Sequence, residues 1–296
     1  MTEFNVEQEE ANLTVGEFLQ RRIPAAPPAY LKQLLKKGKV RGPNGPLAAS
    51  DRLQFAEPIR LPDSGRLQEL LDISLSAPTG VTILYESREI LVVDKPAGLA
   101  IHSSQGHETD NLTARIEQLL KERGSQFQIA PVHRLDLETS GPVLFSKGKQ
   151  ACGRLGQLFI RQEVDKSYLA LVLGKTPGSG DLHSQLIAKG KRKDAHTSYR
   201  ALQRNEQASL LELILHTGCQ HQIRQQLAEL GHPLFGDKRY HGPCPAELPR
   251  MFLHCNRLAF VDPFSAAPIS IDSSLPDDLA NFLPTIGMGR ENSLVD

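Results

Sequence analysis

The strongest constraint on the fold is the irregular succession of strand-like and helix-like segments after Val81. Apolar runs such as VTILY, ILVVDKP, PVLFS, SYLALVL and SLLELILH are typical of strands, whereas NLTARIEQLLKER, QACGRLGQLFIRQ and HQIRQQLAELG have helical spacing. The strands outnumber the helices and do not alternate regularly with them, which argues against a doubly wound fold. We therefore predict an α+β main domain with a mixed, mostly antiparallel sheet.

The preceding residues predict a separate, small α/β domain. An apolar pattern over residues 15–19 indicates one helix, and YLKQLLKKG indicates a second that ends at a cationic turn and Gly38. Two short strands are expected near residues 39–41 and 59–61. The predicted division is a disordered acidic tip at 1–10, the small domain at 11–62, a linker at 63–80, the main domain at 81–285 and a tail at 286–296.

Basic side chains are concentrated in the small domain, although the whole chain has a formal net charge of zero. Residues 11–60 hold nine Lys or Arg against three acids, a difference of +6, which suits a phosphate-binding face. The alternative is a merely solvated helix face. Two helices leading into KKGKVRGPNG resemble the alpha-L RNA-binding domain, although Pro43 and Pro46 alter its strand-turn sequence. The resemblance implies RNA contacts from Lys36, Lys37, Lys39 and Arg41.

The four cysteines are widely spaced and form no CxxC pair, so we expect reduced thiols rather than a zinc knuckle or a disulfide scaffold. The first ten residues lack the apolar core of a signal peptide, and no apolar run reaches the roughly 18 residues of a membrane span. The expectation is a cytoplasmic protein without membrane contact, and we expect it to be a monomer.

The stretch PVHRLDLETSGPVLFS, from Pro131 to Ser146, places a short charged loop between two apolar strands. An Arg, an Asp and two hydroxyl groups at such a junction form either a structural turn or an active-site loop. Taken alone, HRLD favours the structural turn, because short motifs often match by chance.

HRLDxxTSG resembles the active-site signature of the RluA-like pseudouridine synthases. Other segments similar to that family follow in the same order over about 200 residues: ILVVDKPAGLAIH, KSYLALVLG, AHTSY, HQIRQQLAELGHPLFGDKRY and LHCNRLAF. Several ordered motifs are far more specific than one. The resemblance implies a cofactor-free enzyme that converts uridine to pseudouridine in structured RNA.

The resemblance also implies roles for particular residues. Asp136 is the expected catalytic aspartate, Tyr168 the tyrosine packed against the target base, and Arg224 a bidentate partner that keeps the aspartate charged. The reaction breaks the N1–C1′ bond, turns the uracil and rejoins it through C5, and the carboxylate serves either as nucleophile at C1′ or as base at C2′. Neither redox change nor group transfer occurs, so we expect no cofactor.

A uridine inside folded RNA must be flipped out before it can react. Arg134 lies two residues before Asp136, so an extended segment points both the same way. Arg134 is therefore a candidate for filling the vacated stack or clamping a flanking phosphate, and the alternative is a structural ion pair. His133 and His221 are interpreted as packing and hydrogen-bonding residues. No metal is expected, because His216, His221 and His254 lack an established ligand spacing.

Two features qualify the resemblance. Cys219 and Gln220 stand where the family usually has an Arg and a Thr or Ser before HQIR, and Pro142 replaces a common aliphatic residue. Substrate specificity is therefore not carried over from the family. The basic run KGKRKDAH, with Lys191, Arg192 and Lys193, is expected in a loop that either reaches RNA or is simply solvated.

Two rival functions remain at this point. Asp136 and Glu138 could form a carboxylate pair that hydrolyses an N-glycosidic bond, since alternation on an extended segment would place both on one face. Alternatively, the chain could be a non-catalytic RNA-binding or ribosome-assembly factor, although such a factor does not need the three catalytic side chains. Ribosomal RNA is the favoured substrate because the small amino-terminal domain is typical of family members that act there, and transfer RNA is the alternative.

Overall fold

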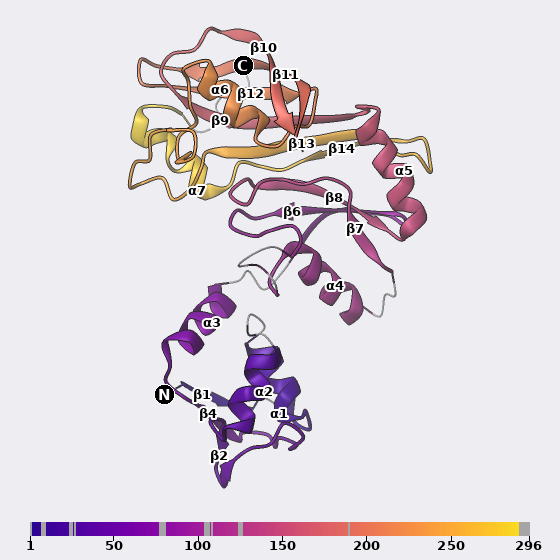
Figure 1. Cartoon of the computed structure of the whole chain (residues 1–296), viewed down its shortest axis with the longest axis vertical. Helices are drawn as coiled ribbons and strands as arrows, with labels where there is room; N and C mark the ends of the chain where they lie inside the picture. Colours follow the sequence, from indigo (N-terminus) through magenta and orange to yellow (C-terminus); the bar gives the residue numbers. More distant parts are fainter. Residues whose placement is uncertain are drawn as a thin grey trace. The chain divides into compact units, whose positions relative to one another are not determined.

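The computed structural model describes residues 2–6, 10–23, 26, 28–76, 81–103, 107, 109–123, 127–188 and 190–289 of the 296. The chain divides into two compact units (Figure 1). Unit 1 comprises Met1–Gly80 and Ser103–Asp110, and unit 2 comprises Val81–His102 and Asn111–Asp296.

Unit 1 packs three helices with a small antiparallel sheet. The helices are α1 Val15–Arg22, α2 Pro28–Lys36 and α3 Gly65–Ser76, and the strands are β1 Thr2–Asn5, β2 Arg41–Gly42, β3 Gly45–Pro46 and β4 Pro58–Leu61, in the order β1-β4-β2-β3. A capping box between Thr14 and Glu17 begins α1. Gly38, with φ 63°, closes α2, which confirms the predicted helix end.

Two boundary predictions in unit 1 are wrong. Residues 2–5 of the tip predicted to be disordered form β1, whose register pairs Thr2 with Leu61 of β4. The predicted linker contains α3, because Leu67 and Leu71 lie one helical turn apart and both are buried in the core of unit 1. Residues 7–9 of the tip and 77–80 of the linker lie outside the described residues.

Unit 2 is built on two antiparallel sheets, which confirms the α+β prediction. One sheet has the order β5-β6-β8-β7, with β5 Thr82–Glu86, β6 Ile90–Lys95, β7 Ile129–Pro131 and β8 Gly141–Lys147. The other has the order β10-β11-β12-β9-β13-β14, with β9 Val164–Leu173, β10 Ser179–Ala188, β11 Lys191–Arg204, β12 Ala208–Leu215, β13 Leu253–Val261 and β14 Pro268–Asp272. The helices are α4 Leu112–Glu122, α5 Lys149–Ile160, α6 Gln222–Glu229 and α7 Asp277–Ala280, followed by the 3-10 helix η2 Leu283–Ile286.

The two sheets meet just before β8. Ser140 forms a parallel bridge with His254 of β13, and the Cys255 amide donates to the Ser140 carbonyl at 2.8 Å. Only glycine fits at Gly141, because φ is 123° and a Cβ would lie 2.1 Å from the Cys255 carbonyl oxygen. This junction holds the segment between β7 and β8 against the six-stranded sheet.

The predicted tail is ordered where it begins. Met288 is buried, and the Gly289 amide donates to Gln203 Oε1 at 2.8 Å, so the predicted boundary at 286 falls inside the packed region. Residues 290–296 lie outside the described residues. Among the helices in the described part of the chain, none is long and apolar enough to cross a membrane.

Candidate active site

A cavity of about 410 Å³ opens in unit 2 beside the segment that joins β7 to β8. Its walls come from that segment, β9, the end of α5, one residue each of β11, β12 and β13, and the loop and first turn of α6. The lining residues include His133, Arg134, Asp136, Thr139, Phe159, Lys166, Tyr168, Lys193, Gly218, Cys219, Gln220, His221 and Arg224. The tertiary fold thus brings together all four residues predicted for catalysis: Asp136, Tyr168, Arg224 and Arg134.

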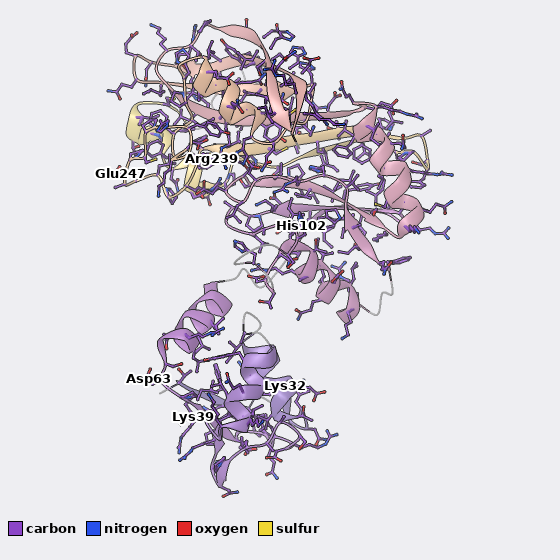
Figure 2. All side chains as sticks on the ribbon, in the orientation of Figure 1. Lys32, Lys39, Asp63, His102, Arg239 and Glu247 are labelled. Carbon is purple, nitrogen blue, oxygen red and sulfur yellow. The ribbon has the colours of Figure 1, made fainter. Side chains whose placement is uncertain are left out.

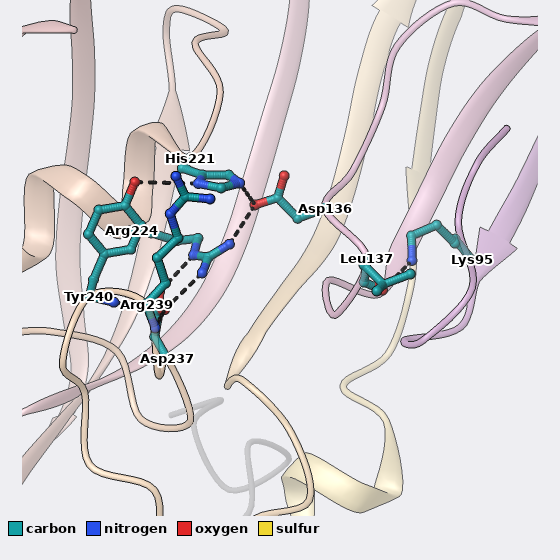
Figure 3. A network of polar contacts seen from close by, with 8 residues as sticks. All are labelled: Lys95, Asp136, Leu137, His221, Arg224, Asp237, Arg239 and Tyr240. Carbon is teal, nitrogen blue, oxygen red and sulfur yellow. Dashed lines mark hydrogen bonds and ion pairs between the residues drawn. The ribbon is translucent and has the colours of Figure 1, made fainter. Parts of the chain in front are cut away.

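Asp136 is held at the cavity wall by two side chains of the α6 segment (Figure 3). Its Oδ2 lies 3.2 Å from Arg224 Nη1 and 3.7 Å from His221 Nε2. The Asp136 side chain is 21% exposed, so one face of the carboxylate stays open to the cavity. A partly desolvated carboxylate with one fixed cationic partner can act as a nucleophile or as a base.

Arg224 makes its bidentate contact with Asp237, not with Asp136 as predicted. Its Nε and Nη2 donate to the two Asp237 oxygens at 2.6 and 2.8 Å, and only Nη1 reaches Asp136 (Figure 3). Burial opposes the charged form of Arg224, but the hydrogen bonds and charges of Asp237 and Asp136 raise its pKa overall. Asp237 therefore fixes the guanidinium, and Nη1 remains to donate to Asp136.

Asp237 is fully buried and was not among the predicted site residues, although the quoted GDKRY segment contains it. Its Oδ1 also accepts the backbone amides of Arg239 and Tyr240, at 3.1 and 3.2 Å. Gly236 before it has φ 80°, and a Cβ there would lie 2.4 Å from the Arg250 carbonyl oxygen. The signal available in the sequence was an acidic residue directly after a glycine, in GDKRY.

His221 makes a hydrogen bond, as predicted, and in addition its ring lies beside Asp136. It adopts left-handed backbone angles (φ 55°, ψ 23°) at the start of α6, and such conformations are uncommon outside glycine. Its Nδ1 lies 3.3 Å from the Tyr240 hydroxyl, and its Nε2 faces Asp136 (Figure 3). Burial lowers the pKa of His221, so the neutral ring is favoured. His133 does match the prediction, because its ring stacks on Phe159 at 5.0 Å and its Nε2 accepts the Leu144 amide.

Tyr168 lies buried on β9 opposite Cys255 of β13 and lines the cavity. Burial raises the pKa of its hydroxyl well above the usual value, and Cys255 and Asp136 act in the same direction. The phenol therefore stays neutral and offers its aromatic face and a hydroxyl to a planar ligand.

Lys166 is a cavity residue that the sequence analysis missed. It lies two residues before Tyr168, so strand alternation places both side chains on the cavity face of β9. Its ammonium lies 5.7 Å from the Phe159 ring centroid, and within the described ranges it forms no ion pair with a carboxylate. Burial lowers the pKa of Lys166. The KSY spacing on a strand was the signal that could have identified it.

A second missed lysine supports the loop that carries Asp136. Lys95, at the end of β6, is almost fully buried, and its Nζ donates to the carbonyl oxygens of Pro96 and Leu99, both at 2.9 Å. It also donates to the carbonyl oxygen of Leu137 at 3.0 Å (Figure 3). Burial lowers its pKa to about 7, and the charge of Arg250 adds to that effect. Three acceptors match the three protons of an ammonium group, so this geometry favours the charged form.

The segment after Asp136 does not continue as an extended strand. Leu137 and Glu138 form a turn in which the Thr139 amide donates to the Asp136 carbonyl at 3.1 Å. Glu138 is exposed and does not line the cavity, so the expectation that it shares a face with Asp136 is wrong. Arg134 is exposed and does line the cavity with Asp136, as alternation before the turn predicts.

The candidate RNA-binding residues fall into two groups. Lys36, Lys37, Lys39 and Arg41 are exposed at the end of α2 and the start of β2 in unit 1, where Figure 2 labels Lys39. Lys191, Arg192 and Lys193 are exposed but belong to strand β11, paired with β10, rather than to the predicted loop. Of these three, only Lys193 lines the cavity. Strand alternation turns the neighbouring Arg192 to the opposite face of β11. Lys189 of the same basic run lies outside the described residues.

Cys219, Gln220 and Pro142, the residues that depart from the family pattern, lie in two different places. Cys219 and Gln220 line the cavity beside Gly218, and the Cys219 amide donates to Gln222 Oε1 at 3.0 Å. Pro142 pairs with Asp94 within the four-stranded sheet, away from the cavity wall. Of these three residues, Cys219 and Gln220 therefore lie on the cavity wall and Pro142 does not.

Comparison with known proteins gives a consistent result. Residues 89–229 match the family described as "RNA pseudouridylate synthase". The chain is 32% identical over 284 residues to an "Uncharacterized RNA pseudouridine synthase" of Aquifex aeolicus, covering 86% of each chain. It is 33% identical to "Ribosomal large subunit pseudouridine synthase D" of Nitrosomonas europaea, over 69% of this chain and 64% of the relative.

A solved structure shows the same similarity. The human protein "RNA Pseudouridylate Synthase Domain Containing 1" superposes with a TM-score of 0.54 at 25% identity, over 70% of this chain and 86% of the human chain. The matched family region contains Asp136, Tyr168 and Arg224 and ends before Asp237.

Proposed function

This chain belongs to the RluA-like family of RNA pseudouridine synthases, and from that premise we propose that it isomerises particular uridines of ribosomal RNA, with Asp136 as its catalytic carboxylate. The observation that carries the proposal is the open face of Asp136 in the cavity, with Arg224 fixed behind it. Ribosomal RNA is favoured over transfer RNA because similar proteins bear the name ribosomal large subunit pseudouridine synthase.

The reaction proceeds on a uridine that has left the RNA stack. A cavity of about 410 Å³ lies in the range of small-molecule pockets, and a base that is stacked inside folded RNA must leave the stack to enter it. On the first route Asp136 attacks C1′ and displaces the uracil at N1, and C5 of the turned uracil then displaces the carboxylate from C1′. On the second route Asp136 removes the C2′ proton as the N1–C1′ bond breaks, and returns it to C2′ when C5 bonds to C1′. On both routes C5 loses its proton and N1 gains one. Tyr168 holds the detached uracil, and Arg134 occupies the vacated stack or clamps a neighbouring phosphate.

Mapping pseudouridines across total RNA from cells with and without the gene tests this function directly. We expect defined sites in large-subunit ribosomal RNA to disappear without the gene and to return with the parent gene but not with an Asp136→Asn variant. Loss of sites in transfer RNA alone would replace the ribosomal substrate. No lost site in any RNA, with the protein expressed, would contradict the assigned activity in that cell.

The exposed cations of unit 1 supply salt-dependent affinity for RNA in this proposal. Replacing Lys36, Lys37, Lys39 and Arg41 together with Gln should reduce the slope of log affinity against log salt by about 0.7–0.9 per lost phosphate contact, or about 3 in total. The rate of the chemical step at saturating RNA should stay near that of the parent. The measurement is RNA binding over a salt series, together with single-turnover kinetics.

A matched control neutralises exposed cations of unit 2 outside the cavity wall, Arg88 and Lys175, each of which faces a glutamate. This double variant should keep the parental slope. An unchanged slope in the fourfold variant would contradict a role for this face in binding RNA.

Lys166 serves in the proposal as a cation for the phosphate of the flipped nucleotide. Lys166→Met should raise the KM for RNA about tenfold or more, as expected for a lost hydrogen bond to a charged group, with a smaller change in kcat. The same variant should unfold at a higher temperature, because burial disfavours the ammonium. Lys175→Gln, outside the cavity, should change neither KM nor kcat. A fall in kcat with unchanged KM would instead assign Lys166 to the chemical step.

A further inference from the structure

Three side chains that can bind a metal ion, one carboxylate and two imidazoles, lie together on the outer face of the six-stranded sheet. Asp181 and His183 are two residues apart on β10, so they point to the same side of the sheet. The β10–β11 register places His196 directly opposite His183. All three are exposed or partly exposed.

The donor atoms of this cluster are close together. His196 Nε2 lies 2.9 Å from Asp181 Oδ1, and the His183 and His196 rings stack at 4.1 Å with an interplanar angle of 14°. One ligand atom from each residue lies within 4.8 Å of the others. Ligands around tetrahedral Zn²⁺ are roughly 3.3 Å apart, given metal–ligand distances of about 2.0–2.2 Å. Side-chain rotations that shorten these separations by up to about 1.5 Å would therefore complete the geometry.

We propose that Asp181, His183 and His196 bind a divalent transition metal ion, with Zn²⁺ as the probe ion. Two imidazoles and one carboxylate form a ligand set that suits zinc, and water can fill the open position. The proton that bridges His196 Nε2 and Asp181 Oδ1 occupies the place that the ion takes, so binding replaces a hydrogen bond rather than leaving a buried group unpaired. His216 is held by a contact of 2.8 Å between its Nε2 and Ser198 Oγ, and its ring stacks on that of His196 at 4.1 Å. His216 therefore helps to orient the imidazole of His196.

The site has a structural consequence for the hairpin. β10 is an edge strand of its sheet, paired with β11, so an ion held by Asp181, His183 and His196 joins the edge strand to its neighbour (Figure 1). The side chain of Thr197, next to His196, points inward, where its hydroxyl donates to Gln226 Oε1 of α6 at 2.7 Å. The ion is therefore on the face of β11 opposite to Lys193 and the cavity, and it takes no part in the isomerisation.

The experiment titrates the full-length protein, freed of metal with a chelator, with Zn²⁺ and with Co²⁺. We expect one saturable site, a Co²⁺ visible spectrum without a thiolate charge-transfer band, and a Zn²⁺-dependent rise in the unfolding temperature. His183→Gln and His196→Gln should each weaken Zn²⁺ binding at least about tenfold, on the scale known for altered metal sites. His241→Asn, which removes an exposed histidine elsewhere in unit 2, should bind as the parent does.

Pseudouridine formation should be the same with and without the ion, so this inference and the proposed function fail independently. Absence of saturable binding by the parent below millimolar Zn²⁺ would overturn the site, whatever the variants do. Equal affinity in the parent and in a folded His183→Gln, His196→Gln double variant would also overturn it. A thiolate charge-transfer band in the parent would assign the ion to cysteines instead.

Discussion

An Asp136→Asn variant is expected to lose pseudouridine formation by about 10⁴-fold or more, the scale on which removal of one catalytic group acts. Asn retains the shape of the side chain and can still accept from Arg224 Nη1, which lies 3.2 Å from Asp136 Oδ2. It has neither the nucleophilicity nor the basicity of a carboxylate. Binding of the same RNA should stay within a few fold of the parent. Tritium release from RNA labelled at uridine C5, measured alongside binding, gives both quantities.

Glu138→Gln is the matched control, because it removes the neighbouring carboxylate that is exposed outside the cavity. It should leave turnover near that of the parent. If both variants were equally inactive and the parent released free uracil, the carboxylate-pair hydrolase would replace the isomerase. Substantial turnover by a folded Asp136→Asn protein would remove Asp136 from its assigned role.

Asp237→Asn is expected to lower the free energy of unfolding by about 3 kcal/mol, because it leaves the buried Arg224 guanidinium without its bidentate partner. Asp237 is 0% exposed, and Asn in its place keeps one oxygen that can accept the amides of Arg239 and Tyr240 but has no second oxygen for Arg224. Turnover should fall with a larger change in kcat than in KM, since Arg224 no longer holds Asp136 in one orientation. Denaturant unfolding and steady-state kinetics measure the two effects.

The control for this variant is Asp272→Asn, which removes an exposed partner of Arg257 at 4.0 Å. A surface pair of this kind contributes about 0–1 kcal/mol, so both stability and turnover should stay near the parental values. Equal stability losses in the two variants would mean that the buried contact with Arg224 has no special weight. Full activity of Asp237→Asn would show that Arg224 positions Asp136 without it.

Local patterns in the sequence predicted the helix ends and the strands and helices that depend on interactions between residues close together in the chain. Gly38 and the cationic turn before it marked the end of α2, and Gly231 likewise closes α6 with φ 88°. Period-two and helical apolar spacing located the main strands and helices of unit 2. The errors at residues 2–5 and 65–76 share one cause. Whether a short strand or helix forms depends on a partner surface, and neither segment contains its own partner.

The catalytic set was predicted from ordered motifs, but its geometry was not. The motifs named Asp136, Tyr168 and Arg224, whereas the bidentate role of Asp237 depends on a turn 13 residues beyond Arg224. The position of Lys166 on the cavity wall likewise becomes visible only when β9 lines a cavity. Hydrogen-bond partners are chosen by distance and angle in space, which sequence separation does not encode.

The sequence by itself therefore determined the family, the α+β class and the residues proposed for the chemistry, because these follow from periodicity and from motif order along the chain. Only the tertiary structure decided which carboxylate faces the cavity and which fixes the arginine. It alone placed His183 opposite His196 and Asp181 opposite the neighbouring Ser198, through the pairing of β10 with β11. Such contacts depend on strand register, and a shift of one residue would turn each of these side chains to the other face of the sheet.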